Sequence, residues 1–217
     1  GIASYTISGD TRFDRVAEIA SRSRNIPVIE QFKGNSPLIV AGSTWKPDEE
    51  LLTRFVNKCG DVKMIFAPHE VNSNNIDRLI QMIKKPVIRL SRTDGINIAD
   101  YKVLIIDSIG ILSSVYKYGT IAYVGGGFGV GIHNILEPAV FGMPVIFGPN
   151  HAKFKEAVDL IKYSGAFSVA NYKQLDDLLV ELLKNKDKLS GSSIICKNYV
   201  INNLGATTII IKKVFNN

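Results

Sequence analysis

The chain has 217 residues, of which 46% are apolar and 21% are charged. These proportions are typical of a soluble globular protein with one domain, or one domain with appendages. They exclude disorder as the dominant state, because this apolar content can bury a core that offsets the loss of chain entropy. Cys59 and Cys196 lie far apart in the sequence, which excludes a disulfide scaffold and favours a reducing compartment.

The charge balance is basic. The 26 lysines and arginines exceed the 20 acidic residues, and the net charge of +6 suits nucleic acid, anionic lipid surfaces and phosphorylated molecules about equally. The basic residues are scattered and form no stripe interleaved with aromatic residues, which argues against nucleic-acid binding. No apolar stretch approaches the roughly 20 residues needed to cross a bilayer, so we expect no spanning segment.

The first 35 residues fit a regular fold poorly. Residues 6–11 have the pattern of a strand end and a turn, and residues 14–24 that of an isolated helix. We therefore expect residues 1–35 to be a linker and edge segment, and residues 36–217 to form the main domain. The start lacks both an initiator methionine and the pattern of a signal peptide, so we expect the chain to be a piece of a longer protein.

From residue 36 onward, short runs rich in β-branched residues alternate with longer segments of helical period. This alternation predicts an α/β fold, a doubly wound parallel sheet of about six strands. Each run is nearly continuous in apolar residues, as expected of strands covered by helices on both faces. The predicted strands cover residues 37–42, 62–67, 86–90, 102–107, 120–124 and 143–148, and the predicted helices residues 47–58, 74–83, 109–118, 134–141, 152–163, 172–184, 189–203 and 207–215.

A glycine-rich segment follows the fifth predicted strand. Five glycines between residues 125 and 131 lead into a predicted helix. Glycines let the backbone approach a ligand closely, and free N–H groups at a helix start attract phosphate or carboxylate. The spacing excludes a strict GxGxxG dinucleotide motif, and the absence of a following Gly-Lys-Ser/Thr excludes a P-loop. We expect an anion site at the carboxyl end of this strand.

His133, Asn134 and Glu137 come directly after the glycines. Asn134 with Glu137 three residues later has the spacing of a helix N-cap and capping box, which would be purely structural. Glu137 could equally contact a ligand. His133 could be a loop histidine with a structural partner, but its place in a glycine-rich loop favours ligand contact.

Several segments resemble the 3-deoxy-D-manno-octulosonic acid (Kdo) transferases, and the resemblance extends over essentially the whole chain. The segments that carry it are Ser8 to Asp14, Gly42-Ser43-Thr44, Asp107 to Tyr116, and Gly125 to Pro149 with Asn150, Phe154 and Glu156. The resemblance implies the Rossmann-like, C-terminal half of a GT-B glycosyltransferase, with residues 1–35 as the interdomain linker and residues 36–217 as the donor-binding domain.

The resemblance also implies a chemistry. The donor would be CMP-Kdo and the acceptor a lipid A precursor, and the transfer would invert the anomeric centre without cofactor or metal. The enzyme would work at the cytoplasmic face of the inner membrane, reached through a missing N-terminal domain. The residues implied in donor binding are Ser43, Thr44, His69, Ile109, Gly110, Ile111, Gly126, Gly127, Phe128, His133, Asn134, Leu136 and Glu137.

Two positions depart from the pattern of the family. The usual Pro-Arg-His is Pro68-His69-Glu70 here, so a guanidinium contact to the donor is missing or replaced by His69. The usual Ser-Thr-His ends in Trp45. The resemblance places the catalytic base on the N-terminal domain, so we expect this chain to bind donor without transferring sugar.

Two other functions remain open on the sequence. One is a GT-B donor domain or related epimerase that uses a UDP-sugar, since the fold and the ribose-binding glutamate are shared. The other is a basic, non-catalytic domain that docks on an anionic membrane or on nucleic acid, for which five glycines at a strand end have no evident use.

Overall fold

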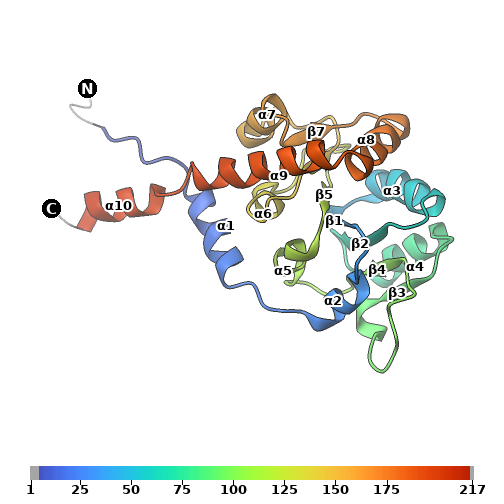
Figure 1. The fold of residues 1–217 in the computed structure, drawn as a ribbon. Coiled ribbons are helices and arrows are strands. Elements are labelled where there is room, and N and C mark those ends of the chain that lie inside the picture. The colour runs from blue at the N-terminus through green and yellow to red at the C-terminus, as the bar shows by residue number, and fades with distance from the viewer. Residues whose placement is uncertain (1–4, 216–217) are drawn as a thin grey trace.

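The structure, a computed structural model, describes residues 5–215. A single sheet of parallel strands lies at its centre, in the order β3-β4-β2-β1-β5-β6-β7 (Figure 1). The strands are β1 (Leu38–Thr44), β2 (Lys63–Pro68), β3 (Val87–Arg89), β4 (Val103–Ile105), β5 (Ile121–Val124), β6 (Val145–Phe147) and β7 (Ala166–Ser168).

All six predicted strands are confirmed, and a seventh was missed. The residues of β1, β2, β4, β5 and β6 are almost all buried, which explains why their apolar runs were recognisable. β7 is a strand of three residues at the edge of the sheet, and its burial falls from Ala166 to Ser168. A run this short and this mixed has no pattern that distinguishes it from a loop.

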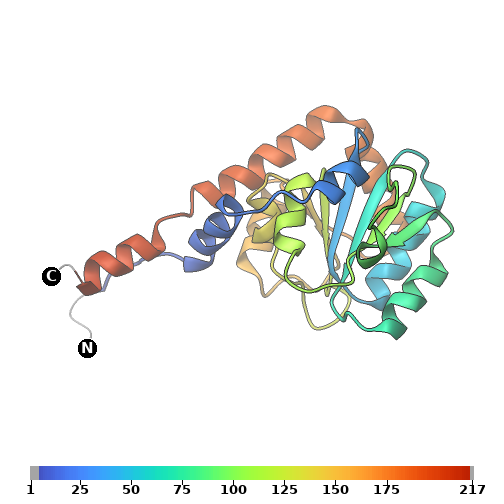
Figure 2. The same cartoon turned by 90° about the horizontal axis from the view of Figure 1, so that it is seen from below.

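Two layers of helices cover the sheet. On one face, α3 (Lys46–Lys58), α4 (Ser73–Met82) and α8 (Tyr172–Lys184) bury apolar side chains against the strands. The other face is covered by α1 (Thr11–Ser21), α2 (Pro27–Lys33), α5 (Leu112–Val115), α6 (Leu136–Ala139), α7 (Lys155–Lys162) and α9 (Lys186–Ile201) (Figure 2). The doubly wound architecture is confirmed.

Two predicted helices are much shorter than expected. Residues 109–118 form the single turn α5 and the 3-10 turn η2 (Tyr116–Tyr118), and residues 134–141 form only α6. Gly110 has a φ of +97°, which no helix accommodates, and Pro138 removes a backbone N–H within the other segment. A second 3-10 turn, η1 (Leu90–Arg92), follows β3.

The N-terminal segment is part of the packed domain. Phe13 and Val16 of α1 and Ile29 and Phe32 of α2 are buried in the core. The predicted strand end at residues 6–11 is wrong, because residues 5–10 have no regular structure and Asp10 caps α1 by accepting from Arg12 N at 2.9 Å. α2 was missed altogether. That residues 1–35 connect two domains stays a prediction.

The chain ends in a helix that projects from the body. α10 (Ala206–Phe215) continues the line of α9 beyond α1 (Figures 1 and 2). The carboxylate of Asp14 accepts from Gly205 N and Thr207 N, each at 2.7 Å, and so fixes where α10 begins. By length and composition alone, the helical stretch Lys186–Phe215 could cross a membrane, contrary to the expectation of no spanning segment. A turn at residues 202–205 separates its two helices.

Phe32 tests whether the N-terminal segment belongs to the domain. Its ring is fully buried, so Phe32→Ala is expected to lower the free energy of unfolding by about 3–5 kcal/mol. Ile7→Ala is the control, because Ile7 is 81% exposed and its loss should leave stability within about 0.5 kcal/mol. Urea denaturation followed by circular dichroism measures both. Equal stability of the two variants would show that residues 1–35 are an appendage.

Candidate functional site

The site lies where the connections of the sheet diverge. β1 is central, paired with β2 on one side and β5 on the other. The chain leaves β1 towards β2 and leaves β5 towards β6, so the loops after β1 and β5 open a crevice at the carboxyl edge. In open α/β sheets this is the position where ligands bind.

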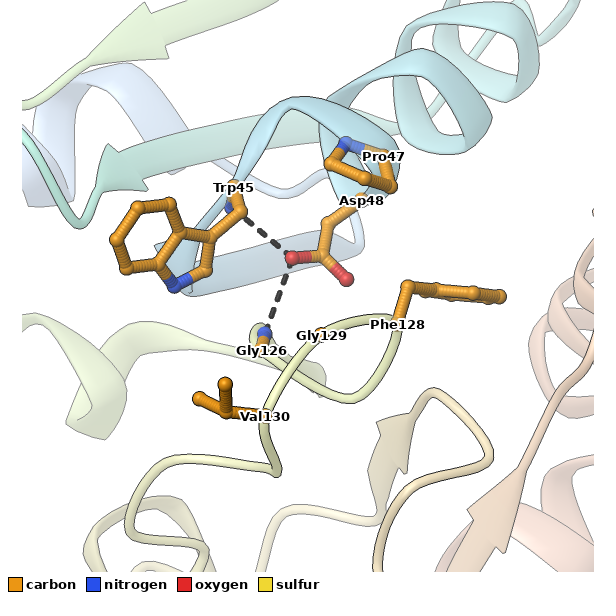
Figure 3. A pocket seen from close by; sticks show the side chains of 7 residues that line it. All are labelled: Trp45, Pro47, Asp48, Gly126, Phe128, Gly129 and Val130. Atoms are coloured by element: carbon orange, nitrogen blue, oxygen red, sulfur yellow. Dashed lines mark hydrogen bonds between the residues drawn. The ribbon is translucent and has the colours of Figure 1, made fainter.

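Asp48 joins the two loops that form this crevice. It lies in the first turn of α3 and is buried, and one carboxylate oxygen accepts from Trp45 N at 2.9 Å and from Gly126 N at 3.1 Å (Figure 3). Its other oxygen accepts from the hydroxyl of Tyr123 at 2.7 Å. Burial raises the pKa of Tyr123, and Asp48 raises it further, so this hydroxyl remains a donor.

The glycines of the loop after β5 allow close packing of backbone on backbone. A Cβ at Gly125 would lie 2.2 Å from the carbonyl oxygen of Ser43, and one at Gly127 would lie 2.5 Å from the nitrogen of Gly148. Gly126 has a φ of +92°, which side chains rarely adopt. Gly131 has a φ of +141°, so four of the five glycines are required by the fold itself, independently of any approach of a ligand.

The loop after β6 supports the same glycine segment from the other side. Asn150 donates its backbone N–H to Gly127 O at 2.9 Å and its side-chain amide to Gly129 O at 2.6 Å. A few residues later, the buried Glu156 accepts from both terminal nitrogens of Arg12, at 2.8 and 3.2 Å. The segments around Arg12 and Glu156, far apart in sequence, therefore meet in the structure.

Three rings gather above the glycine loop. The ring of His69 stacks at 4.5 Å on that of Trp45 and, also at 4.5 Å, on that of His133. The indole Nε1–H of Trp45 donates to His133 Nε2 at 3.1 Å. Burial lowers the pKa of His133, and the neighbouring His69 lowers it further, which favours the neutral imidazole.

Two pockets open on either side of these rings. The pocket of about 250 Å³ is lined by Trp45, Pro47, Asp48, Gly126, Phe128, Gly129 and Val130 (Figure 3). The other, of about 130 Å³, lies over the ends of β1, β2 and β4 and is lined by Ser43, Ala67, Pro68, His69, Val71, Ile106, Ser108, Ile109, Gly110 and Leu112. Neither lining includes a lysine or arginine.

Most of the predicted site residues lie at this edge. Gly126 and Phe128 line the larger pocket, Gly127 lies buried beside them, and Ser43, His69, Ile109 and Gly110 line the smaller one. His133 and Trp45 connect the two through their hydrogen bond. The structure therefore brings the predicted residues together from four separate loops. Which of them contact a ligand stays a prediction.

Three predicted residues have side chains turned to the protein. The hydroxyl of Thr44 is buried and donates to Glu49 at 3.1 Å, and Glu49 is also paired with Arg78 at 2.6 Å. Leu136 is fully buried, and Ile111 packs against the core. Any contact that Thr44 or Leu136 makes with a ligand must therefore come from the main chain.

The predicted capping box at Asn134 and Glu137 does not form. Asn134 Oδ1 accepts from Leu136 N at 3.1 Å, but Glu137 Oε1 accepts from the Asn134 side chain at 3.2 Å and not from its backbone. Burial raises the pKa of Glu137, and the hydrogen bond from Asn134 offsets part of that rise. The second carboxylate oxygen of Glu137 makes no hydrogen bond within residues 5–215.

Asp48 is the residue that the sequence analysis missed. An acid in the first turn of a helix after proline is common and has a sufficient explanation in the helix dipole, so nothing in the sequence marked it as buried. Within residues 5–215 no group of three or more histidine, cysteine or acidic residues could hold a metal ion. That the protein needs no metal stays a prediction.

Curated relatives decide the family. A 3-deoxy-D-manno-octulosonic acid transferase of Aquifex aeolicus is 32% identical over 157 residues, which are 70% of this chain and 43% of the relative. The chain belongs to the Kdo transferase family. A Kdo transferase of Chlamydia trachomatis serovar A is 28% identical over 161 residues, covering 72% of this chain and 37% of the relative. The chain thus spans about two fifths of the length of these Kdo transferases. A scan against protein-family models finds no match.

Solved structures agree on the fold, which is that of the C-terminal half of a GT-B glycosyltransferase. The C-terminal CMP-Kdo binding domain of WaaA from Acinetobacter baumannii superposes with a TM-score of 0.60 at 22% identity, over 84% of this chain and 96% of that one. The UDP-GlcNAc 2-epimerase of Neisseria meningitidis gives a TM-score of 0.66 at 15% identity, over 97% of this chain and 54% of that one.

Asp48→Ala tests the junction between the loops. It leaves three donors without their acceptor, and each unpaired buried group costs about 1–3 kcal/mol. The free energy of unfolding should therefore fall by about 3 kcal/mol. Urea denaturation measures the change. Glu50→Ala is the matched control, since its exposed side chain makes only a 3.9 Å ion pair and its removal should matter little. Equal effects of the two substitutions would contradict this role of Asp48.

Proposed function

We propose that this chain is the donor-binding domain of a glycosyltransferase that transfers Kdo from CMP-Kdo to a lipid A precursor. The similarity to Kdo transferases over 157 residues carries the proposal, because it covers 70% of this chain and is thus more than one shared motif. The similar domain of WaaA from Acinetobacter baumannii is described as a CMP-Kdo binding domain, which supports the choice of donor.

Within the crevice, each part of the donor has a chemically suitable partner. The half-buried carboxylate of Glu137 has one oxygen free to accept from the ribose hydroxyls. Most N–H groups of the glycine loop already donate within the protein, but those of Phe128 and Val130 make no hydrogen bond within residues 5–215 and can donate to the phosphate. The same holds for the backbone N–H groups of Ile109, Gly110 and Ile111. His69 and His133 can donate to the phosphate or to the sugar carboxylate. Fixed donors of this kind also stabilise the charge that develops on departing CMP.

The transfer itself also needs a base for the proton of the acceptor hydroxyl. The acceptor hydroxyl attacks the anomeric carbon, the bond to the phosphate oxygen of CMP breaks with its electron pair, and a base takes the hydroxyl proton. Asp48 is buried and already accepts three hydrogen bonds, so it is unsuited to be that base. We propose that the base, the lipid-binding surface and the attachment to the cytoplasmic face of the inner membrane belong to the rest of the enzyme.

Nucleotide preference tests the proposed donor. Calorimetric titration of the chain with CMP, UDP and GDP should show binding of CMP ahead of the other two. A preference for UDP would overturn the proposal and favour a UDP-sugar enzyme, whose fold the Neisseria meningitidis epimerase shares. Binding should depend only moderately on ionic strength, because Lys46 and Arg78 line a neighbouring pocket whereas no lysine or arginine lines the two pockets beside the rings. A steep loss of binding between low and physiological salt would favour a docking domain instead.

Glu137→Gln, measured in the same titration, tests the ribose contact. The variant keeps an oxygen for the bond from Asn134 and removes the charge, so CMP affinity should fall about tenfold or more, since hydrogen bonds to charged groups are worth about 1.5–3 kcal/mol. The control is Glu18→Ala on α1, remote from the crevice, where affinity should be unchanged. Unchanged CMP affinity in Glu137→Gln would exclude this contact.

The isolated chain is expected to bind donor without transferring sugar. The assay is Kdo transfer from CMP-Kdo to a lipid A precursor by the purified 217 residues, with a full-length Kdo transferase as positive control. Turnover by this chain alone would refute the proposal that the base lies elsewhere.

A further inference from the structure

The cluster of Trp45, His69 and His133 has a chemical feature beyond its stacking. Trp45 donates its indole N–H to Nε2 of His133, and indole nitrogen is a donor only. Nε2 must therefore be the acceptor, which it can be only when it carries no proton. A neutral imidazole whose Nε2 accepts carries its proton on Nδ1.

We propose that Trp45 is a positioning residue that holds His133 in the Nδ1–H form, so that His133 presents a fixed N–H donor to an anionic oxygen of the ligand. This inference rests on the proposed function, because it assumes that the crevice binds an anionic donor. It concerns a position at which this chain departs from the usual family pattern, where tryptophan replaces histidine.

The surroundings of His133 leave its Nδ1 free for that role. Within residues 5–215 no hydrogen bond to Nδ1 is formed, while Nε2 is occupied by Trp45 and the backbone N–H is bound to Gly125 O at 3.1 Å. The backbone bond anchors the residue to the glycine loop. The indole bond and the ring of His69 then fix the orientation of the imidazole.

Protonation of His133 would disrupt this arrangement. An imidazolium has N–H groups on both nitrogens, so Nε2–H would face the N–H of Trp45, donor against donor. The titratable groups facing the ring are His69, which follows β2, and Asp48, from α3. Burial and His69 lower the pKa of His133 while Asp48 raises it, and the net direction is downwards.

Trp45→Phe tests the hydrogen bond separately from the stacking of the rings. Phenylalanine keeps an aromatic face against His69 and removes the N–H, whereas Trp45→His keeps a ring N–H and should restore part of the effect. The first readout is ¹⁵N NMR of the His133 imidazole in the free protein. The wild type should show the Nδ1–H form. Trp45→Phe should shift the population towards Nε2–H and raise the pKa of His133, and unchanged nitrogen shifts in this variant would overturn the inference.

The second readout is the pH profile of CMP affinity. In Trp45→Phe the imidazole would carry its proton on Nε2, so the lone pair of Nδ1 would face the anion. CMP affinity should therefore fall about tenfold at pH 8, which corresponds to the loss of one hydrogen bond worth about 1.4 kcal/mol. The ratio of variant to wild-type affinity should recover at pH values below the pKa of His133 that the NMR titration gives for this variant, because both nitrogens then carry protons. A merely structural loss would persist at both pH values and would count against the proposal. Tyr163→Phe, a half-exposed aromatic away from the crevice, is the control.

The two readouts separate this inference from the proposed function. Failure of the wild type to bind CMP would refute the proposed function, while the NMR measurement on free protein would still test how Trp45 acts on His133. Normal CMP binding with an unchanged His133 spectrum in Trp45→Phe would refute the inference alone.

Discussion

The carboxylate of Asp48 is the contact on which the geometry of the crevice depends. It accepts from the backbone on both sides of the gap, from Trp45 after β1 and from Gly126 after β5, and from the hydroxyl of Tyr123 within β5. Loops that leave neighbouring strands lack the regular pairing of strands, so their spacing depends on individual contacts such as this one. A buried acceptor with three donors supplies that contact and also orients Trp45 towards His133.

The glycines and the remote motifs are consequences of the same constraint. With the loops held this close, no Cβ fits at Gly125, and Gly127 lies against the backbone of Gly148. Asn150 then holds the far side of the glycine loop, and the pairing of Glu156 with Arg12 fixes α7 against the N-terminal helix. Several of the residues that resemble the Kdo transferases therefore build the crevice, in addition to those that line its pockets.

The sequence predicted the sheet well because its central strands are buried on both faces. A short, wholly apolar run such as Ile121 to Val124 is typical of a buried strand and of little else. It predicted less well where a local pattern competes with tertiary contacts. Residues 27–33 pack Ile29 and Phe32 into the core in a helix too short to be recognised by its periodicity. Asp48 could not be singled out, because an acid after proline at a helix start looks the same whether it faces water or three buried donors. The side chain of Thr44 is likewise kept out of the crevice by its hydrogen bond to Glu49, which pairs with Arg78. No pattern in the sequence indicates these contacts.

The two departures from the family pattern are physically one change. Trp45 and His69 come from different loops, yet their rings are in contact with each other, and His69 is also in contact with His133. An arginine at position 69 would bring a guanidinium into the place where the stacked ring now lies, and a smaller ring at position 45 would leave part of that face uncovered. Replacing both together exchanges the guanidinium contact for ring N–H donors whose orientation the stacking fixes. Such donors depend on geometry more than on charge, so in our proposal the positioning of His133 by Trp45 takes over part of the role of the guanidinium.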